Sequence, residues 1–148
     1  YAYSAAGDLV AHTDPTGATT RYVYDGAHNL VRIEDPLGRP IRRHEFDADG
    51  RLIAMTDANG NRLAVAHDLA AREERVVDPR GHTSVFHYDE QGNVLSFTNP
   101  LGHTTTFTYD ADGNQLTQTD PLGRTISNTW DERGNLASET DALGHVTE

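Results

Sequence analysis

Apolar and polar residues alternate along much of this chain. In the stretch 104–109, Thr105, Phe107 and Tyr109 alternate with threonines. Successive side chains of a β-strand point to opposite faces of the sheet, so this pattern predicts a strand with an aromatic face and a polar face. Equivalent strands are expected to present on the aromatic face Thr20/Tyr22/Tyr24, Leu63/Val65/His67, Ser84/Phe86/Tyr88 and Ile126/Asn128/Trp130.

The strands that precede these show a similar alternation. Their apolar residues are expected to lie on one side as the pairs Val31/Ile33, Ile53/Met55 and Leu95/Phe97. The other face is rich in Thr, Ser, Arg and His, and His44 and His87 are expected there. Threonine is a good strand former that can pair across strands.

Turn sequences separate the strands at a fixed period. A first turn follows an aromatic-Asp pair and has glycine at positions 7, 50, 92, 113 and 134. His28 and Ala71 occupy this position in the two remaining repeats, and the successive steps are 21, 22, 21, 21, 21 and 21 residues. A second turn, typically Asp-Pro-x-Gly, places another glycine ten residues later, with no exception. In such turns Asp caps the backbone two residues on, Pro presets φ, and Gly supplies a positive φ. The single extra residue falls between Gly38 and Gly50.

This organisation predicts an all-β fold of tandem antiparallel β-hairpins, in about seven units of 21 residues. Residues 1–148 are expected to form one repeat domain. Hydrophobic residues make up 36% of the chain, a thin supply for a compact core, as expected of an array in which each unit contacts its neighbours. A sheet of this many strands must twist, curl or close, so a curved, spiralling sheet is expected.

The fourth repeat is degenerate. The stretch 67–75 replaces the aromatic residue, the glycine and the apolar pair, and local propensity also allows a helical turn over Leu69 to Arg75. Because Asp78-Pro79-Arg80-Gly81 returns in register, we predict a degenerate β unit here.

Composition narrows the classes of function. The net charge of −11 argues against nucleic-acid binding. The chain has no cysteine, which excludes disulfides and thiolate metal sites, and no apolar run long enough to cross a membrane. It begins at Tyr1 and stops at Glu148, both inside repeats, so we expect it to be part of a longer array.

Three kinds of chemistry can be weighed against this background. The stretches that start at Asp47 and Asp110 resemble the opening of an EF-hand loop, but their twelfth positions, Ala58 and Pro121, lack the required Glu. A self-capped turn is therefore favoured over a calcium site. No Gly-x-Ser-x-Gly motif suggests a nucleophile. We predict no catalytic, cofactor-binding or metal-binding residue, no cofactor and no enzymatic activity.

Histidine remains as a candidate metal ligand. His82, His103 and His145 share the position after the second glycine, which Arg39 and Arg124 occupy in other units. Because arginine shares this position, surface histidines are favoured over a zinc site, which needs three or four convergent ligands. The aromatic residues could bind sugars if exposed, although a packed aromatic face is favoured.

The Tyr-Asp pairs at Tyr24, Tyr88 and Tyr109, with Gly-Asn-x-Leu and Thr-Asp-Pro-Leu-Gly downstream, resemble the YD or Rhs (rearrangement hotspot) repeat family over the entire chain. The resemblance implies a large secreted or surface-associated bacterial parent. In that family the strands spiral into a hollow β-cage around a C-terminal toxin domain, as in Rhs effectors of type VI secretion and insecticidal toxin complexes. Related repeats act in adhesion.

The resemblance therefore implies that this chain is cage wall, with neighbouring repeats and an enclosed toxin as its partners. Nothing in the sequence matches the closing core segment that cleaves itself in many family members. Three functions stay open, namely an encapsulating segment, an adhesive or carbohydrate-binding surface repeat and, much less favoured, a hydrolase. Self-association through unpaired sheet edges is also expected.

Overall fold

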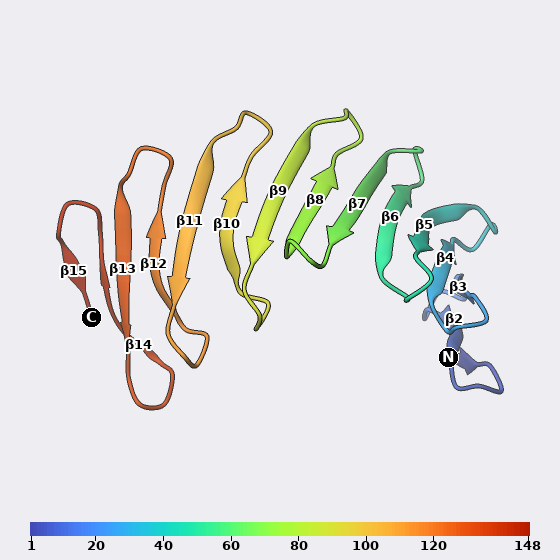
Figure 1. The fold of residues 1–148 in the computed structure, drawn as a ribbon. Coiled ribbons are helices and arrows are strands. Elements are labelled where there is room, and N and C mark those ends of the chain that lie inside the picture. Colours follow the sequence, from blue (N-terminus) through green and yellow to red (C-terminus); the bar gives the residue numbers. More distant parts are fainter. The chain divides into compact units, whose positions relative to one another are not determined.

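A computed structural model describes residues 1–148, and it contains strands and turns but no helix (Figure 1). Fifteen strands form a sheet whose strand order is the chain order, and the paired strands are antiparallel. The prediction of an all-β fold of tandem antiparallel hairpins is therefore confirmed. No segment forms a helix that could cross a membrane.

The residues group into two compact modules. Module 1 comprises Tyr1–Ala66 and Val77–Gly81, and module 2 comprises His67–Val76 and His82–Glu148. The strands that lie mainly in module 1 are β1 Ala2–Tyr3, β2 Leu9–Thr13, β3 Thr19–Tyr24, β4 Leu30–Glu34, β5 Pro40–Phe46, β6 Leu52–Asp57 and β7 Arg62–Asp68. Those mainly in module 2 are β8 Glu73–Val77, β9 Thr83–Tyr88, β10 Val94–Thr98, β11 Thr104–Tyr109, β12 Gln115–Thr119, β13 Thr125–Trp130, β14 Leu136–Thr140 and β15 Val146–Thr147.

The two faces of each module differ as the alternation predicts. In β11, Thr105, Phe107 and Tyr109 are half-buried, whereas the threonines between them are exposed. Only Ala54 is fully buried in the whole chain. The aromatic face is therefore sheltered by neighbouring side chains of the same face and not by a second layer of structure.

Threonine hydroxyls pair across the strands, as expected. The Oγ1 atoms of Thr108 and Thr117 lie 2.6 Å apart, and Thr129 and Ser138 make the equivalent contact at 2.8 Å one hairpin later. These cross-strand hydrogen bonds link neighbouring strands in addition to the backbone ladder.

A β-bulge recurs just after the first turn, and the sequence reading missed it. Tyr88 lies opposite Val94, but His87 lies opposite Ser96, so Leu95 is the extra residue. The residues skipped in the same way in other repeats are Val10, Val31, Ile53, Leu116 and Ala137. Such a bulge bends the strand and increases its twist.

The bulge changes which apolar residue lies opposite the aromatic one. The predicted pairs Val31/Ile33, Ile53/Met55 and Leu95/Phe97 each combine a bulged residue with one in register. The partners of the aromatic residues are instead Leu30, Leu52 and Val94. Positions 31, 53 and 95 thus have no partner in the ladder, and strict alternation holds only outside the bulge.

The extra residue in the second repeat corrects the placement of His44. Ile33 pairs with Arg42 and Glu34 with Pro40, so the inserted Ile41 bulges out of the ladder. This shift by one residue turns His44 to the side of Phe46, and the two ring centroids are 6.3 Å apart. The prediction that His44 lies on the polar face was wrong, whereas His87 is exposed on that face as predicted.

The fourth repeat forms β-structure, which confirms the degenerate unit. Residues 69–72 make a turn and β8 follows directly. The positive φ of 51° belongs to Arg72 and not to Ala71, because this turn is one residue longer. His28, with φ of 63°, does take the place of glycine as predicted.

Candidate functional site

The most regular chemical feature of the chain is the Asp-capped turn. Asp110 Oδ1 accepts hydrogen bonds from the backbone N–H groups of Asp112 and Asn114 at 3.0 and 2.9 Å, and its Oδ2 accepts the side-chain amide of Asn114 at 2.9 Å. The Gly113 N–H donates to the Asp110 carbonyl at 3.2 Å. This is a type I turn closed by a glycine of positive φ, a common three-residue hairpin loop.

Second turns use the same chemistry with a different closing side chain. Asp120 Oδ1 accepts the N–H groups of Leu122 and Arg124, and its Oδ2 accepts Arg124 Nε at 2.6 Å. In the last unit His145 Nδ1 makes the equivalent contact with Asp141 at 2.8 Å. At the position after the second glycine, Arg39, Asn61, Arg124 and His145 each place a side-chain donor on the turn carboxylate, which explains why arginine and histidine both occur there.

These donors hold the turn carboxylates in their charged form. Side-chain donation by Asn114, followed by its backbone N–H, lowers the pKa of Asp110 below its ordinary value. For Asp120 the backbone N–H of Arg124 is the larger cause of a lowered pKa, and the guanidinium of Arg124 is the next. The oxygens of Asp110, the first position of the EF-hand-like stretch, are thus already engaged by the turn itself.

Consecutive first turns contact one another along one edge of each module. A Cβ placed on Gly113 would lie 3.6 Å from Asn93 Oδ1, and one on Gly134 would lie 3.9 Å from Asn114 Oδ1. In module 1, His28 Nδ1 contacts the Asp8 carboxylate of the preceding turn at 2.9 Å. Residues of one repeat thus reach the turn of the next.

The aromatic column has a polar role that the sequence reading did not anticipate. Tyr109 Oη donates to the Val94 carbonyl at 3.0 Å, and Trp130 Nε1 donates to the Gln115 carbonyl at 2.9 Å. In module 1, His44 Nδ1 donates to the Leu30 carbonyl at 2.8 Å.

Each acceptor is the residue just before a bulge, beyond the last backbone pair with the next strand. The aromatic side chain therefore joins two strands where their ladder ends. Tyrosine and tryptophan suit this place because they combine an apolar ring with a donor. At Tyr109 the tyrosine of the Tyr-Asp pair and the bulge after Val94 form one device, and only the bulge lacks a sequence signature.

The histidines do not gather into a metal site. No group of three or more His, Cys, Asp or Glu side chains is placed to hold a metal ion. His145 belongs to its own turn, and His103 contributes its backbone N–H to Asn99. In the fourth repeat His67 contacts Glu74 at 3.1 Å, so a polar pair stands where other repeats place an aromatic and an apolar residue.

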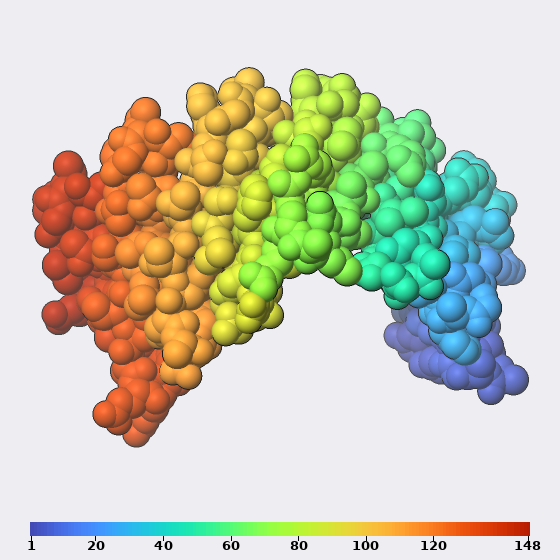
Figure 2. All heavy atoms as spheres, in the orientation of Figure 1, coloured from blue at the N-terminus to red at the C-terminus, as the bar shows by residue number.

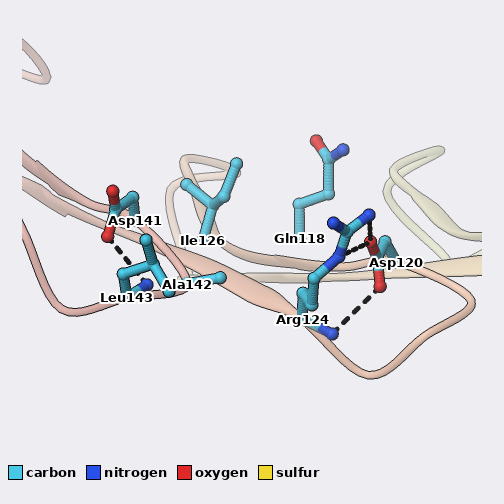
Figure 3. Close-up of a pocket in the computed structure, with 7 residues that line it drawn as sticks. All are labelled: Gln118, Asp120, Arg124, Ile126, Asp141, Ala142 and Leu143. Carbon is cyan, nitrogen blue, oxygen red and sulfur yellow. Dashed lines mark hydrogen bonds and ion pairs between the residues drawn. The ribbon is translucent and has the colours of Figure 1, made fainter.

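Open grooves lie on the surface of module 2. One of about 450 Å³ in module 2 lies between the last two second turns, lined by Ile126, Gln118, Ala142, Leu143 and the Asp120–Arg124 ion pair (Figure 3). A second, of about 460 Å³, lies on the aromatic face and is lined by Glu74, Phe86, Tyr88, Gly92 and Val94.

The fold and these turns define a tandem β-hairpin repeat protein, in which each repeat is closed by two self-capped turns. The chain matches the RHS Repeat family over residues 3–40, 46–83 and 88–125. Because these matches cover well over half of the chain, it belongs to the RHS repeat family, as the Tyr-Asp pairs predict.

Similar proteins include toxin components. Over 100 residues the chain is 31% identical to the double-stranded DNA deaminase toxin A of Burkholderia cenocepacia (strain H111), a match that covers 64% of this chain but 6% of the toxin. The fold resembles a chain of the Photorhabdus luminescens Tc holotoxin pore, with a TM-score of 0.70 at 18% identity over 99% of this chain and 9% of that one. It also resembles TcdB2-TccC3, with a TM-score of 0.71 at 19% identity over 97% and 9%. The chain thus spans less than a tenth of the length of these relatives.

Proposed function

We propose that this chain is a segment of the wall of a hollow shell that encloses a C-terminal toxin or effector domain until delivery. The observation that carries the proposal is the aromatic face. It bears the largest side chains of the array, yet only Ala54 of the whole chain is fully buried. A face of this kind is suited to an interior, where it is screened from bulk water by the rest of the wall.

The uniformity of the repeats supports a non-enzymatic, structural role. The same capped turn recurs in nearly every unit, and the grooves are lined by residues that belong to the repeat pattern. Active sites require a singular arrangement of a nucleophile, a base and its orienting group. A wall made of equal units requires only that each unit continue the sheet.

The named relatives supply the class of cargo. One is a DNA deaminase toxin, and a structure of TcdB2-TccC3 without its hypervariable C-terminal region has the same fold in the segment matched here. The deaminase activity belongs to that relative. By analogy we assign to the parent of this chain a secreted or surface-associated location and a variable domain behind the repeats, with no preference among delivery systems.

The complete coding sequence of the parent is the first test. We expect the array to continue, to end in a closing segment and to be followed by a C-terminal domain. A parent that lacks both the closing segment and that domain overturns the proposal.

Protease protection in the full-length parent is the second test. A specific protease site inserted in the C-terminal domain should be cut slowly in the native protein. It should be cut rapidly once a hairpin is disrupted by Asp110→Ala combined with Gly113→Val. Glu132→Gln, an exposed change in a neighbouring turn, is the matched control and should leave protection intact. Equal cleavage in all three proteins contradicts encapsulation.

Glycan binding is a second candidate function, favoured by the groove that combines Phe86 and Tyr88 with the carboxylate of Glu74. Sugars commonly stack on aromatic rings and donate hydroxyl hydrogen bonds to carboxylates. A glycan array tests this function. Binding that is lost in Tyr88→Ala but retained in Tyr22→Ala, a change on the equivalent face of module 1, would favour glycan binding. No binding to any glycan counts against it.

A further inference from the structure

Module 2 displays a row of exposed leucines along the edge formed by its second turns. Leu101, Leu122 and Leu143 are 80%, 79% and 82% exposed. The backbone N–H of each leucine donates to the side chain of residue 99, 120 or 141 at 2.8 to 2.9 Å. The turns thus hold each leucine at a fixed tip, and the gold, orange and red turns along the upper margin of Figure 2 form separate projections.

The turn itself does not require leucine at this position. Thr16, Asn59 and Arg80 occupy it in other repeats, beside Leu37 in module 1, and all make the same backbone bond at 2.8 to 2.9 Å. The first turns on the opposite edge of module 2 carry Gln91, Asp112 and Arg133 at the equivalent position. In module 2 the leucines are therefore confined to one edge, where most of their surface is exposed, and an edge that gathers exposed apolar groups can serve as an interaction surface.

The same edge carries a groove that can accept such a leucine. Ile126 and Gln118, which lie opposite each other in the ladder, project between the turns of residues 120–124 and 141–145, and Ala142 and Leu143 form one wall (Figure 3). Its volume of about 450 Å³ exceeds that of a leucine side chain. Tip and groove therefore lie side by side on one surface, which is the condition for a self-complementary contact.

Charge favours this edge over the opposite one. The second turns of module 2 hold the carboxylates of Asp120 and Asp141, and the first of these is paired with Arg124. The first turns accumulate acidic residues at positions 89, 90, 110, 112, 131 and 132, against which stand only Arg72, paired with Glu90, and Arg133. In a chain with a net charge of −11, two copies repel each other least where the acids are fewest and paired.

We propose that the leucine edge, defined as Leu101, Leu122, Leu143 and the adjoining groove, binds the same edge of a second copy of this chain. The two copies share one hairpin spacing, so the tips of one can enter the spaces between the tips of the other around a twofold axis. The surface is small, so the association is weak, with a dissociation constant on the order of micromolar or above. The proposal is independent of encapsulation and stands or falls without a cargo.

Sedimentation velocity over a concentration series tests this contact. The wild-type chain should self-associate, and Leu101→Asn/Leu122→Asn/Leu143→Asn should weaken the association by roughly a hundredfold or more. Asparagine is tolerated at this position, as Asn59 shows, and circular dichroism confirms the fold. Gln91→Asn on the opposite edge is the control and should associate like the wild type. A wild-type chain that is monomeric at all concentrations overturns the proposal.

Cysteine cross-linking locates the contact, since the chain has no cysteine of its own. Under mild oxidation Leu122→Cys, the central tip, should form a disulfide-linked dimer, whereas Gln91→Cys and Arg133→Cys should not. Equal cross-linking at all three positions overturns the proposal. A second result would also overturn the proposal. If Thr147→Pro in the last strand abolishes the association and the triple leucine variant leaves it unchanged, the copies pair through their sheet edges.

Discussion

Alanine in place of Gly17 isolates the contribution of backbone conformation to the stability of a turn. Gly17 has φ of +86°, and a Cβ built on it meets no atom within 4 Å. The substitution therefore adds no steric contact and removes no side-chain bond. An L-residue in the left-handed region costs about 1 to 2 kcal/mol, so the free energy of unfolding should fall by about that amount.

Gly26 provides a matched control in the same module. A Cβ there also meets nothing within 4 Å, but its φ is not in the positive region. Alanine should therefore be neutral or should stabilise by about 0.4 to 1 kcal/mol, because it reduces the conformational entropy of the unfolded chain. The two sites contrast a positive with an ordinary φ, and the difference between the variants should be about 1 to 3 kcal/mol.

Urea unfolding monitored by circular dichroism measures both variants. Because repeat arrays can unfold in parts, hydrogen exchange at the amide of Ala18, which donates to Asp14 Oδ1 at 3.0 Å, should be measured as a local probe. Faster exchange is expected in Gly17→Ala and not in Gly26→Ala. If both variants lose the same stability, the positive φ of the second glycine is not what constrains this column.

Three further predictions follow from the contacts. The turn carboxylates have lowered pKa values in the folded chain. The stability that they contribute is therefore present above the unfolded pKa of about 3.9 and is lost as the pH falls below it. A pH titration followed by circular dichroism would contradict this if unfolding began near pH 6, where histidine titrates. Tyr109→Phe removes the hydrogen bond to the Val94 carbonyl and should cost about 1 kcal/mol in urea unfolding, and an unchanged midpoint would show that water replaces the hydroxyl. The open strands β1 and β15 should pair with other chains, and Thr147→Pro should reduce thioflavin binding on prolonged incubation, with Glu148→Gln as the control.

The turns were the most predictable part of the fold. Asp, Pro and Gly each act on the backbone within four residues, so their chemistry is local and can be read from spacing. The capping bonds of Asp110 and Asp120 and the positive φ of the second-turn glycines agree with that reading. Ala71 does not take the place of the turn glycine as predicted. The turn is one residue longer there, so Arg72 is the residue with a positive φ.

The strands were predictable only between their irregularities. Alternation placed Phe107 and Tyr109 correctly but missed the bulge at Leu95 and misassigned His44. A bulge or an inserted residue shifts every following side chain to the other face, and neither Leu95 nor Ile41 carries a local signal that it leaves the ladder. The register between two strands decides this, and register is a property of the pair.

The sequence by itself determined the repeat, its period, the two turns and the family, because these depend on local backbone chemistry and on self-similarity. Only the tertiary structure decided where the bulges lie, that Tyr109 and Trp130 bridge to backbone carbonyls of the preceding strand, and that three leucines line one edge beside a groove. The bulge and the side-chain bridge arise between residues that lie 6 to 15 positions apart in the chain. Their geometry is set by hydrogen-bond pairing across the sheet, which spacing along a single chain does not encode.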